Sequence, residues 1–183
     1  FLINSYNAFT WKLIVDNYPV GSIKDLGSLL KTPWQKKFFK LRDEQRCLDD
    51  IEHEMIRKQF AEPRIHFAVV CASKGCPALQ NQAFTDANLE QLLESSTINF
   101  LTDPDRNALD TPRKIIKISK IFQWFEQDFS KSSGSVEAFV AGRITDDLAL
   151  QERIRTKEFD KQYLDYDWDL NERVTTKSVS YTH

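Results

Sequence analysis

The chain has few glycines, and their spacing matches no phosphate-binding loop. Only five glycines occur among its 183 residues. Nucleotide-binding loops of the dinucleotide and P-loop types need two or three glycines at fixed short spacing, followed by a helix. Nucleotide binding through a Gly-rich loop is therefore disfavoured.

Long apolar runs and basic patches are also missing. No stretch approaches the roughly 18 consecutive apolar residues of a transmembrane helix, so we expect no membrane span. Lys and Arg number 25 against 27 Asp and Glu, giving a net charge of −2, and the cations are spread along the chain. Because nucleic-acid binding normally needs a clustered basic surface, no nucleic-acid partner is expected.

Cysteine and histidine are too few and too scattered for a metal framework. A structural zinc site usually shows two closely spaced ligand pairs, whereas the closest cysteines here form C-x4-C. The odd number of cysteines also allows no complete set of disulfides. We expect no metal and no cofactor from these six residues: Cys47, Cys71, Cys76, His53, His66 and His183.

Apolar residues are plentiful. They make up 41% of the chain and include 13 Phe and 4 Trp, enough for a core without disulfides. Length and composition predict one domain over residues 1–173, followed by a polar, flexible tail over 174–183. The chain opens inside an apolar pattern, FLINSYNAFTW, which indicates that the N-terminus of the domain is truncated.

The apolar spacing predicts several helices and short strands. Charged and apolar residues alternate at 113–119, and a second alternating pattern occurs at 162–171. Both lie far along the chain from a hairpin pattern near the N-terminus. Because strands and helices mix without regular βαβ alternation, the fold class is α+β, with a small, mostly antiparallel sheet packed by several helices. The expected helices are 1–18, one starting at 49, 86–101, 121–129, 135–142 and 145–156; the expected strands are 36–41, 45–48, 64–71, 113–119 and 162–171.

The first helix carries polar residues on an apolar background. Asn4, Asn7 and Trp11 fall on one stripe, beside Tyr6. A buried amide needs partners, because an unpaired one costs about 1–3 kcal/mol. Either these amides bind loop backbone and fix the packing of the helix, or Asn7 or Tyr6 orients a catalytic imidazole or an oxyanion.

The second helix begins with acidic residues and a histidine. Asp49 and Glu52 resemble a capping pair, and His53 lies off the apolar stripe in the first turn. The helix N-terminus lowers an imidazole pKa, whereas the neighbouring carboxylates raise it. His53 is therefore either a surface histidine beside capping acids or a catalytic base, with Glu52 as its orienting group.

The segment RIHFAVVC, residues 64–71, is apolar on both faces, which is typical of a central, covered strand. His66 in such a strand is either a hydrogen-bonded core residue or a base. Cys71 would lie on the opposite face, where a free cysteine behaves as a small apolar residue. Cys47 is interpreted in the same way.

Cys76 lies in the loop after this segment, where scaffolds commonly display reactive groups. Lys74 supplies a nearby cation, and Gly75 allows backbone N–H groups to turn toward one point, beside Ser73. Both features favour a thiolate. A nucleophile, a disulfide with Cys71 and a structural thiol remain alternatives for Cys76.

Five stretches, taken together and in order, resemble the family called domain of unknown function 547. They are NSYNAFT, LDDIEHEMIR, RIHFAVVCASKGCPAL, SKIFQWFEQDF and YLDYDWDLN, spanning Asn4 to Asn171. The resemblance implies motif positions without established roles at Asn4, Tyr6, Asn7, Asp50, Glu52, His53, Arg64, His66, Cys71 and Cys76. It also implies export for bacterial members, and fusion to leucine-zipper, glutaredoxin-like or DEP regions for eukaryotic ones.

Two functions fit these residues. The first is a thiol-dependent hydrolase or acyltransferase, with Cys76 as nucleophile, His53 or His66 as base, and Asn7 or Glu52 as orienting group. Its arrangement would be papain-like by analogy of fold alone. The second is a non-enzymatic module that binds a small molecule, a peptide or a protein, with Asn4, Tyr6, Ser73, Lys74, Gly75 and Arg64 around its groove. For a bacterial protein, the resemblance implies a periplasmic or secreted location.

Overall fold

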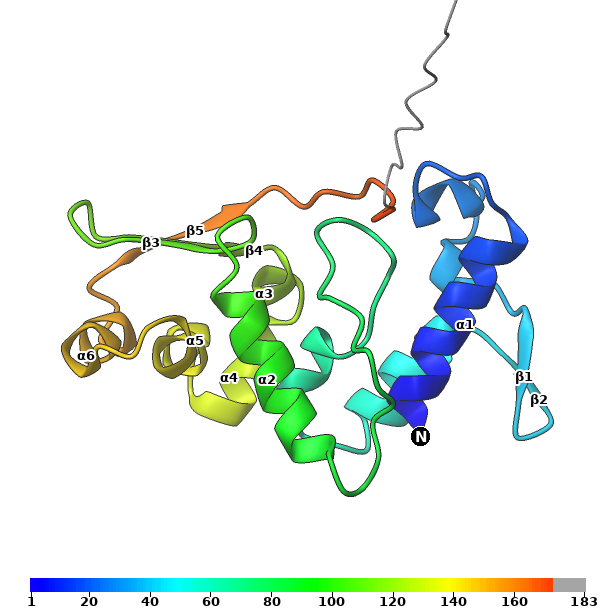
Figure 1. The fold of residues 1–183 in the computed structure, drawn as a ribbon, viewed down its shortest axis with the longest axis horizontal. Coiled ribbons are helices and arrows are strands. Elements are labelled where there is room, and N and C mark those ends of the chain that lie inside the picture. The colour runs from blue at the N-terminus through cyan, green and yellow to red at the C-terminus, as the bar shows by residue number, and fades with distance from the viewer. Residues whose placement is uncertain (173–183) are drawn as a thin grey trace, which may run out of the picture.

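A computed structural model describes residues 1–172 of the chain, so the expected tail at 174–183 lies outside the described residues. Figure 1 shows a three-stranded sheet with two helices at one end and a long helix with a hairpin at the other. The α-helices are α1 (Leu2–Asp16), α2 (Leu89–Leu101), α3 (Ile121–Trp124), α4 (Glu126–Ser133), α5 (Val136–Ile144) and α6 (Leu148–Arg155). The strands are β1 (Phe39–Leu41), β2 (Glu44–Arg46), β3 (Ala108–Asp110), β4 (Ile115–Ser119) and β5 (Asp160–Leu164).

Four further helical segments are wound more tightly or more widely than an α-helix. Three are 3-10 helices and the fourth, η3, is a π-helix. They are η1 (Ile23–Leu26), η2 (Pro33–Gln35), η3 (Asp50–Arg57) and η4 (Pro63–Phe67). The mixture of helices with two small sheets confirms the α+β class.

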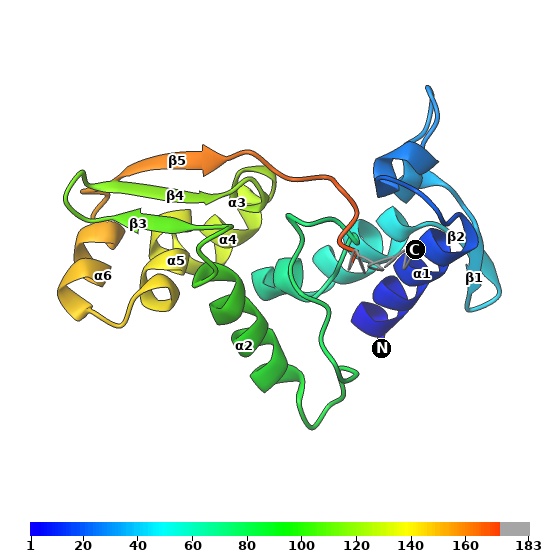
Figure 2. The same ribbon diagram turned by 45° about the horizontal axis from the view of Figure 1, so that its top comes forward.

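The larger sheet has the strand order β3-β4-β5. β3 pairs with β4 in antiparallel fashion, and β5 joins β4 in parallel, with Ile116 opposite Lys161. Ile116 and Ile118 point into the core while Lys117 between them is exposed, as the alternating sequence predicts. Figure 2 shows α5 and α6 beneath this sheet. β1 and β2 form the expected hairpin near the N-terminus.

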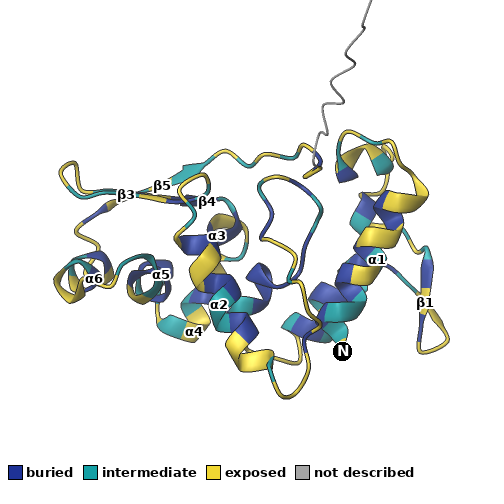
Figure 3. Ribbon diagram, in the orientation of Figure 1, coloured by how far each residue is buried: buried dark blue, intermediate teal, exposed yellow. Residues whose placement is uncertain are grey.

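The core of the described residues falls into two clusters. The first lies between α1, η1, the β1–β2 hairpin and η3, and includes Ile51 and Leu48. The second lies between β4, α5, α6 and the Phe-rich helices α3 and α4, and includes Phe122 and Phe139. In Figure 3, α1 alternates between exposed and buried along its length, as a helix with one buried face does.

The strand expected at 64–71 is wrong. Residues 63–67 form the 3-10 helix η4, because Pro63 begins a turn and the Glu62 side chain accepts a hydrogen bond from the backbone N–H of Arg64. The segment is nevertheless buried, as its apolar composition predicted. Its backbone needs no neighbouring strand, since the Asn7 amide bonds the carbonyl of Ala68 at 2.9 Å and the N–H of Val70 at 2.9 Å.

Two other boundaries differ from expectation. The helix expected at 121–129 is interrupted at Phe125, which separates α3 from α4. The strand expected at 162–171 ends at Leu164, and the chain then continues in extended form across to the first core (Figures 1 and 2). There Leu170 bonds the carbonyl of Gly21 at 2.8 Å and pairs with Ser73.

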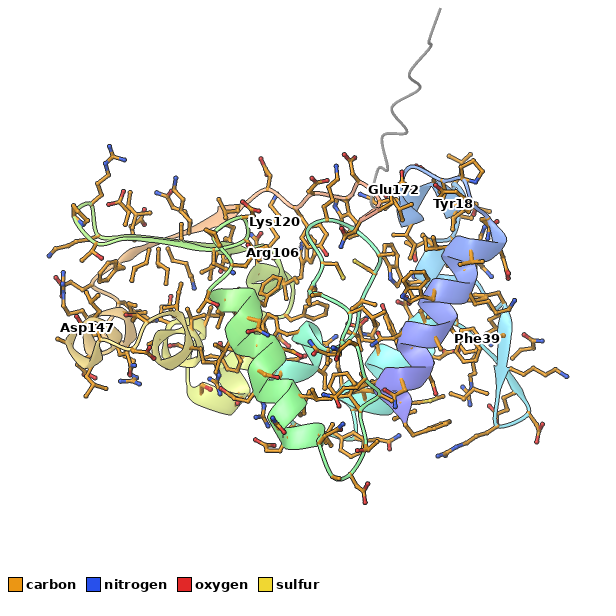
Figure 4. The ribbon with its side chains drawn as sticks, viewed as in Figure 1. Tyr18, Phe39, Arg106, Lys120, Asp147 and Glu172 are labelled. Carbon is orange, nitrogen blue, oxygen red and sulfur yellow. The ribbon has the colours of Figure 1, made fainter. Side chains whose placement is uncertain are left out.

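This crossing segment, residues 165–172, is called here the crossover, and its end is hydrogen-bonded to the chain just after α1. Glu172 accepts a hydrogen bond from the Tyr18 hydroxyl at 2.8 Å, and Figure 4 shows these two labelled side chains side by side. The crossover therefore joins the two cores and lies over the region between them. None of the helices within residues 1–172 combines the length and the apolar character that crossing a membrane requires.

Candidate functional site

A pocket of about 200 Å³ lies between the two cores. Its walls come from α1, η2, η3, η4, the loop after η4, α3 and the crossover. Segments far apart in the sequence thus meet at one place, which is where ligand sites tend to form. The lining residues are Tyr6, Trp34, Asp49, Glu52, His53, His66, Val69, Cys71, Cys76, Pro77, Ile121, Trp124, Phe125, Tyr166 and Trp168.

Cys71 is the pocket cysteine whose pKa is lowered. Its Sγ lies 3.1 Å from the Ser73 hydroxyl and 3.2 Å from the Tyr166 hydroxyl. Hydrogen bonding from Cys76, and then from Ser73 and Tyr166, outweighs burial and lowers the pKa of Cys71 to about 6. A thiol with this pKa is largely thiolate at neutral pH, which is the nucleophilic form.

Cys76 has the opposite character. Its side chain is buried, and its Sγ accepts a hydrogen bond from the Cys71 backbone N–H at 2.8 Å. Burial, followed by the neighbouring Cys71, raises the pKa of Cys76 well above its usual range. This reverses the order expected from the sequence, because residues 64–71 do not form the strand that would have turned Cys71 into the core. Both thiols are free, as is Cys47.

His66 is held at the floor of the pocket. Its Nε2 lies 2.9 Å from Asp128 Oδ2, and its ring stacks on Phe125 with centroids 3.8 Å apart. Hydrogen bonds from His66 and Arg57 outweigh burial and lower the pKa of Asp128, which keeps this carboxylate ionised. An ionised Asp128 fixes the ring proton on Nε2, so Nδ1 carries the lone pair.

The Nδ1 atom of His66 has no hydrogen-bond partner among the described residues and is buried. Burial lowers the pKa of His66, so the imidazole is neutral and able to accept a proton. The carboxylate that faces Nδ1 is that of Glu52, whose Oε1 lies 3.8 Å from this nitrogen. A buried acceptor without a partner, in the wall of a pocket, is an unusual feature that a ligand or a water can satisfy.

Glu52 is buried deeper than an α-helical pattern predicts. It lies in η3, whose π-helical turn is wider than an α-helical one, and only 7% of its surface is exposed. Burial raises the pKa of Glu52, which favours the protonated carboxyl. Glu52 can therefore act as a proton donor in a pocket whose histidine acts as an acceptor.

His53 also lines the pocket, but its two ring nitrogens face Arg57 and Asp49. Its Nδ1 accepts a hydrogen bond from Arg57 at 3.0 Å, and its Nε2 is 3.7 Å from Asp49. Arg57 in turn makes a two-point ion pair with Asp128. Within residues 1–172 no hydrogen bond joins a thiol to either imidazole, so the expected Cys–His contact is not formed directly.

The remaining residues singled out by the sequence lie outside the pocket or support its walls. Asn4 bonds both backbone polar groups of Phe84, in the same manner as Asn7 bonds Ala68 and Val70. Arg64 pairs with carboxylates of η4 and α2, away from the thiols. Tyr6 lines the pocket and is buried, and burial raises its pKa well above the usual range.

The loop at 73–76 does not offer the free N–H groups that an oxyanion would need. The N–H of Lys74 bonds Asp169, that of Gly75 bonds Asp167 at 2.9 Å, and that of Cys76 bonds Ser73. The Lys74 ammonium forms an exposed ion pair with Asp169 at 3.0 Å and lies outside the lining of the pocket.

Arg106, labelled in Figure 4, holds the same loop from the outer side. Its guanidinium donates to the backbone carbonyls of Lys74 and Cys76. The crossover and Arg106 together make the loop a rigid wall of the pocket.

The sequence interpretation missed Asp128, Arg57 and the aromatic residues of the crossover and α3. Asp128 and Trp124 lie in the motif SKIFQWFEQDF, and Tyr166 and Trp168 lie in YLDYDWDLN. These two motifs were used for helix and strand assignment and for the family resemblance, although an acidic residue among aromatics was also a signal for a polar partner. No group of His, Cys, Asp and Glu in the described part of the chain is arranged to hold a metal ion.

Comparison with known families gives one match. The model of a family described as "Protein of unknown function, DUF547" matches residues 1–101. This range contains α1, η3, η4 and both pocket cysteines, while Asp128 and the crossover lie beyond it. No curated protein and no solved structure matches the chain.

Proposed function

Because the chain belongs to the DUF547 family, whose description states no activity, we propose from the pocket itself that the protein is a thiol-dependent hydrolase or acyltransferase. Cys71 is its nucleophile in place of Cys76. One observation carries the proposal: a low-pKa thiol and a buried, unpartnered imidazole nitrogen line the same pocket.

The first half of the reaction is acyl transfer to the thiol. The Cys71 thiolate forms a bond to the acyl carbon, and the bond from that carbon to the leaving group breaks. The Tyr166 hydroxyl, 3.2 Å from the sulfur, holds the thiolate before attack. Protonated Glu52 gives its proton to the departing group, which leaves Glu52 as a carboxylate.

The second half is hydrolysis of the thioester or transfer to another acceptor. Water, or an acceptor hydroxyl or amine, loses a proton to His66 Nδ1 as it bonds to the acyl carbon, and the Cys71 thiolate departs. Asp128 stabilises the imidazolium that forms, through the 2.9 Å contact to Nε2. His66 then returns the proton to Glu52 across 3.8 Å, which restores the starting state.

The other candidate, a non-enzymatic binding module, draws support from the structural hydrogen bonds of Asn4 and Asn7. In that case the pocket would bind its ligand without forming a covalent adduct. The two functions differ in one measurable property, the reactivity of Cys71 toward acyl donors.

The first test is alkylation by iodoacetamide across pH 4.5 to 9.5. We expect a rate midpoint near the pKa of about 6 that the Cys71 environment sets. Cys71→Ser removes this phase, whereas Cys76→Ser retains it, because serine still supplies a hydrogen-bond donor. A midpoint near the ordinary cysteine value of about 8.5 would contradict the proposal.

The second test is acylation by p-nitrophenyl acetate, followed by intact mass. Wild type releases nitrophenol in a burst and then turns over, while His66→Gln acylates at Cys71 and deacylates about 100-fold more slowly. Thermal unfolding of His66→Gln establishes that the variant is folded. An adduct on Cys71 that never turns over, or no adduct at all, would favour the binding module.

A further inference from the structure

The mouth of the pocket is walled by aromatic rings from three segments. Trp168 of the crossover lies 5.8 Å from Trp34 of η2, 5.6 Å from Trp124 of α3 and 4.5 Å from Tyr166, between ring centroids. Trp124 is 45% exposed, although it belongs to this cluster. An aromatic wall that is only partly covered leaves ring faces available to a ligand.

Two acidic side chains, Asp49 and Glu52, line the pocket, whereas no Lys or Arg side chain is among its lining residues. Because burial raises the pKa of Glu52 and favours its protonated form, Asp49 is the carboxylate that faces a ligand. The Arg57 guanidinium is paired with Asp128 through two hydrogen bonds, at 2.6 and 3.1 Å. His66 adds no charge, because burial lowers its pKa. Among the lining residues, an anionic ligand would therefore meet a carboxylate and no Lys or Arg.

One ring of the wall already faces an ammonium group. The Lys24 Nζ lies 4.6 Å from the centroid of the Trp168 ring. Aromatic faces attract cations through the negative potential of the ring, and several rings with nearby carboxylates form the usual binding site for alkylammonium groups. The pocket volume of about 200 Å³ suits an alkylammonium group and is too small for the whole of a larger ligand.

We propose that the pocket recognises a substrate carrying an ammonium group, with Trp124 and Trp168 against the alkyl carbons of that group and Asp49 facing its charge. The inference rests on the proposed function, in that the ammonium group fixes the position of the acyl carbon next to Cys71. The unpartnered His66 Nδ1, buried in the same pocket, is an independent indication that a ligand completes this site.

The test is binding of choline against its neutral isostere, 3,3-dimethylbutan-1-ol, to the Cys71→Ser variant of the whole chain by calorimetry. We expect choline to bind about tenfold more tightly than the isostere. Trp124→Ala and Asp49→Asn each weaken choline binding about tenfold, and Asp49→Asn leaves the isostere unaffected. Trp11→Ala is the matched control, because Trp11 is 54% exposed on α1 and does not line the pocket.

Equal binding of the two ligands, choline binding that resists both Trp124→Ala and Asp49→Asn, or no binding would overturn the inference. Its failure is separable from failure of the proposed function. If Cys71 alkylates with a midpoint near 6 while choline shows no preference, only the ammonium specificity is lost. If choline binds selectively but Cys71 forms no acyl adduct, the enzyme proposal falls and the ammonium site belongs to a binding module.

Discussion

At the scale of single residues, the two cysteines of the pocket differ through their hydrogen bonds. The Cys71 sulfur receives hydrogen bonds from Cys76, Ser73 and Tyr166, whereas burial is the largest cause of the raised pKa of Cys76. Sequence spacing cannot express this difference, because the Tyr166 hydroxyl comes from 95 residues away. Tyr166 is therefore one of the donors that lower the pKa of Cys71.

Tyr166→Phe tests this role. The change removes one hydroxyl donor from the Cys71 thiolate, and a hydrogen bond to a charged group contributes about 1.5–3 kcal/mol. Loss of a donor to the charged form raises the thiol pKa, so the alkylation midpoint of Cys71 should rise by about one pH unit or more. The rate against pH measures it.

Tyr163→Phe, in β5 and without a hydrogen bond to either thiol, is the matched control and should leave the midpoint in place. An unchanged midpoint in Tyr166→Phe would mean that Cys71 is not held by this hydroxyl.

The sequence predicted several candidate residues of the pocket but assigned some of them to the wrong surroundings. Glu52, His66, Tyr6 and both cysteines were recognised because polar residues in apolar segments are conspicuous. Asp128 was missed because it lies on α4, 62 residues from His66 in the sequence, and only the fold brings the two together.

At the scale of elements, the spacing of apolar residues was sufficient to predict a helix or strand that buries one face against one core. It predicted α1, α2 and β4, whose apolar residues repeat with a single period, while the polar turn between two short segments predicted the β1–β2 hairpin. It failed at residues 64–71, since a run buried on all sides has no period to read. There the Asn7 amide replaces the strand neighbour, and no local pattern reveals a partner 61 residues away.

Gly75 is the point where the cysteine loop and the crossover come closest. A Cβ placed there would lie 3.1 Å from the backbone N and O of Asp167 and 3.1 Å from the Tyr166 ring. Such contacts are too short for backbone atoms, which have little freedom to move. Gly75→Ala should therefore displace the crossover, cost about 1–3 kcal/mol of unfolding free energy and raise the alkylation midpoint of Cys71.

Gly142→Ala is the matched control for this substitution. Gly142 lies in α5, and its nearest neighbours to a new Cβ are side-chain atoms at 3.6 and 3.9 Å. Alanine in a helix is favoured over glycine by about 0.5–1 kcal/mol, so this variant should be slightly more stable. Urea unfolding of both variants measures the difference, and equal stability would refute the close approach at Gly75.

At the scale of the whole molecule, the pocket lies where the two cores meet. The crossover spans them on one side. On another side the Asp128 cluster joins α4 to Arg57 of η3 and His66 of η4. A pocket between two cores depends for its shape on the segments that connect them.

The Asp128 cluster also makes stability depend on pH. The pKa of Asp128 is lowered in the folded protein, so the unfolded chain takes up the proton first as pH falls. The stabilisation is therefore complete above the unfolded value of about 3.9 and is lost as pH falls below it toward the folded pKa. Asp128→Asn should cost about 2 kcal/mol at pH 7, and the deficit should shrink between pH 5 and pH 3.

Urea unfolding at pH 7, 5 and 3 compares wild type, Asp128→Asn and the control Asp165→Asn. Asp165 is fully exposed and pairs with Lys120 at the surface, so its loss should change stability by less than about 0.5 kcal/mol at each pH. A deficit for Asp128→Asn that stays constant down to pH 3 would mean that the carboxylate is not ionised by its partners. It would then no longer hold the charge that His66 needs when it accepts a proton, and the link between the two cores would be separate from the chemistry proposed for the pocket.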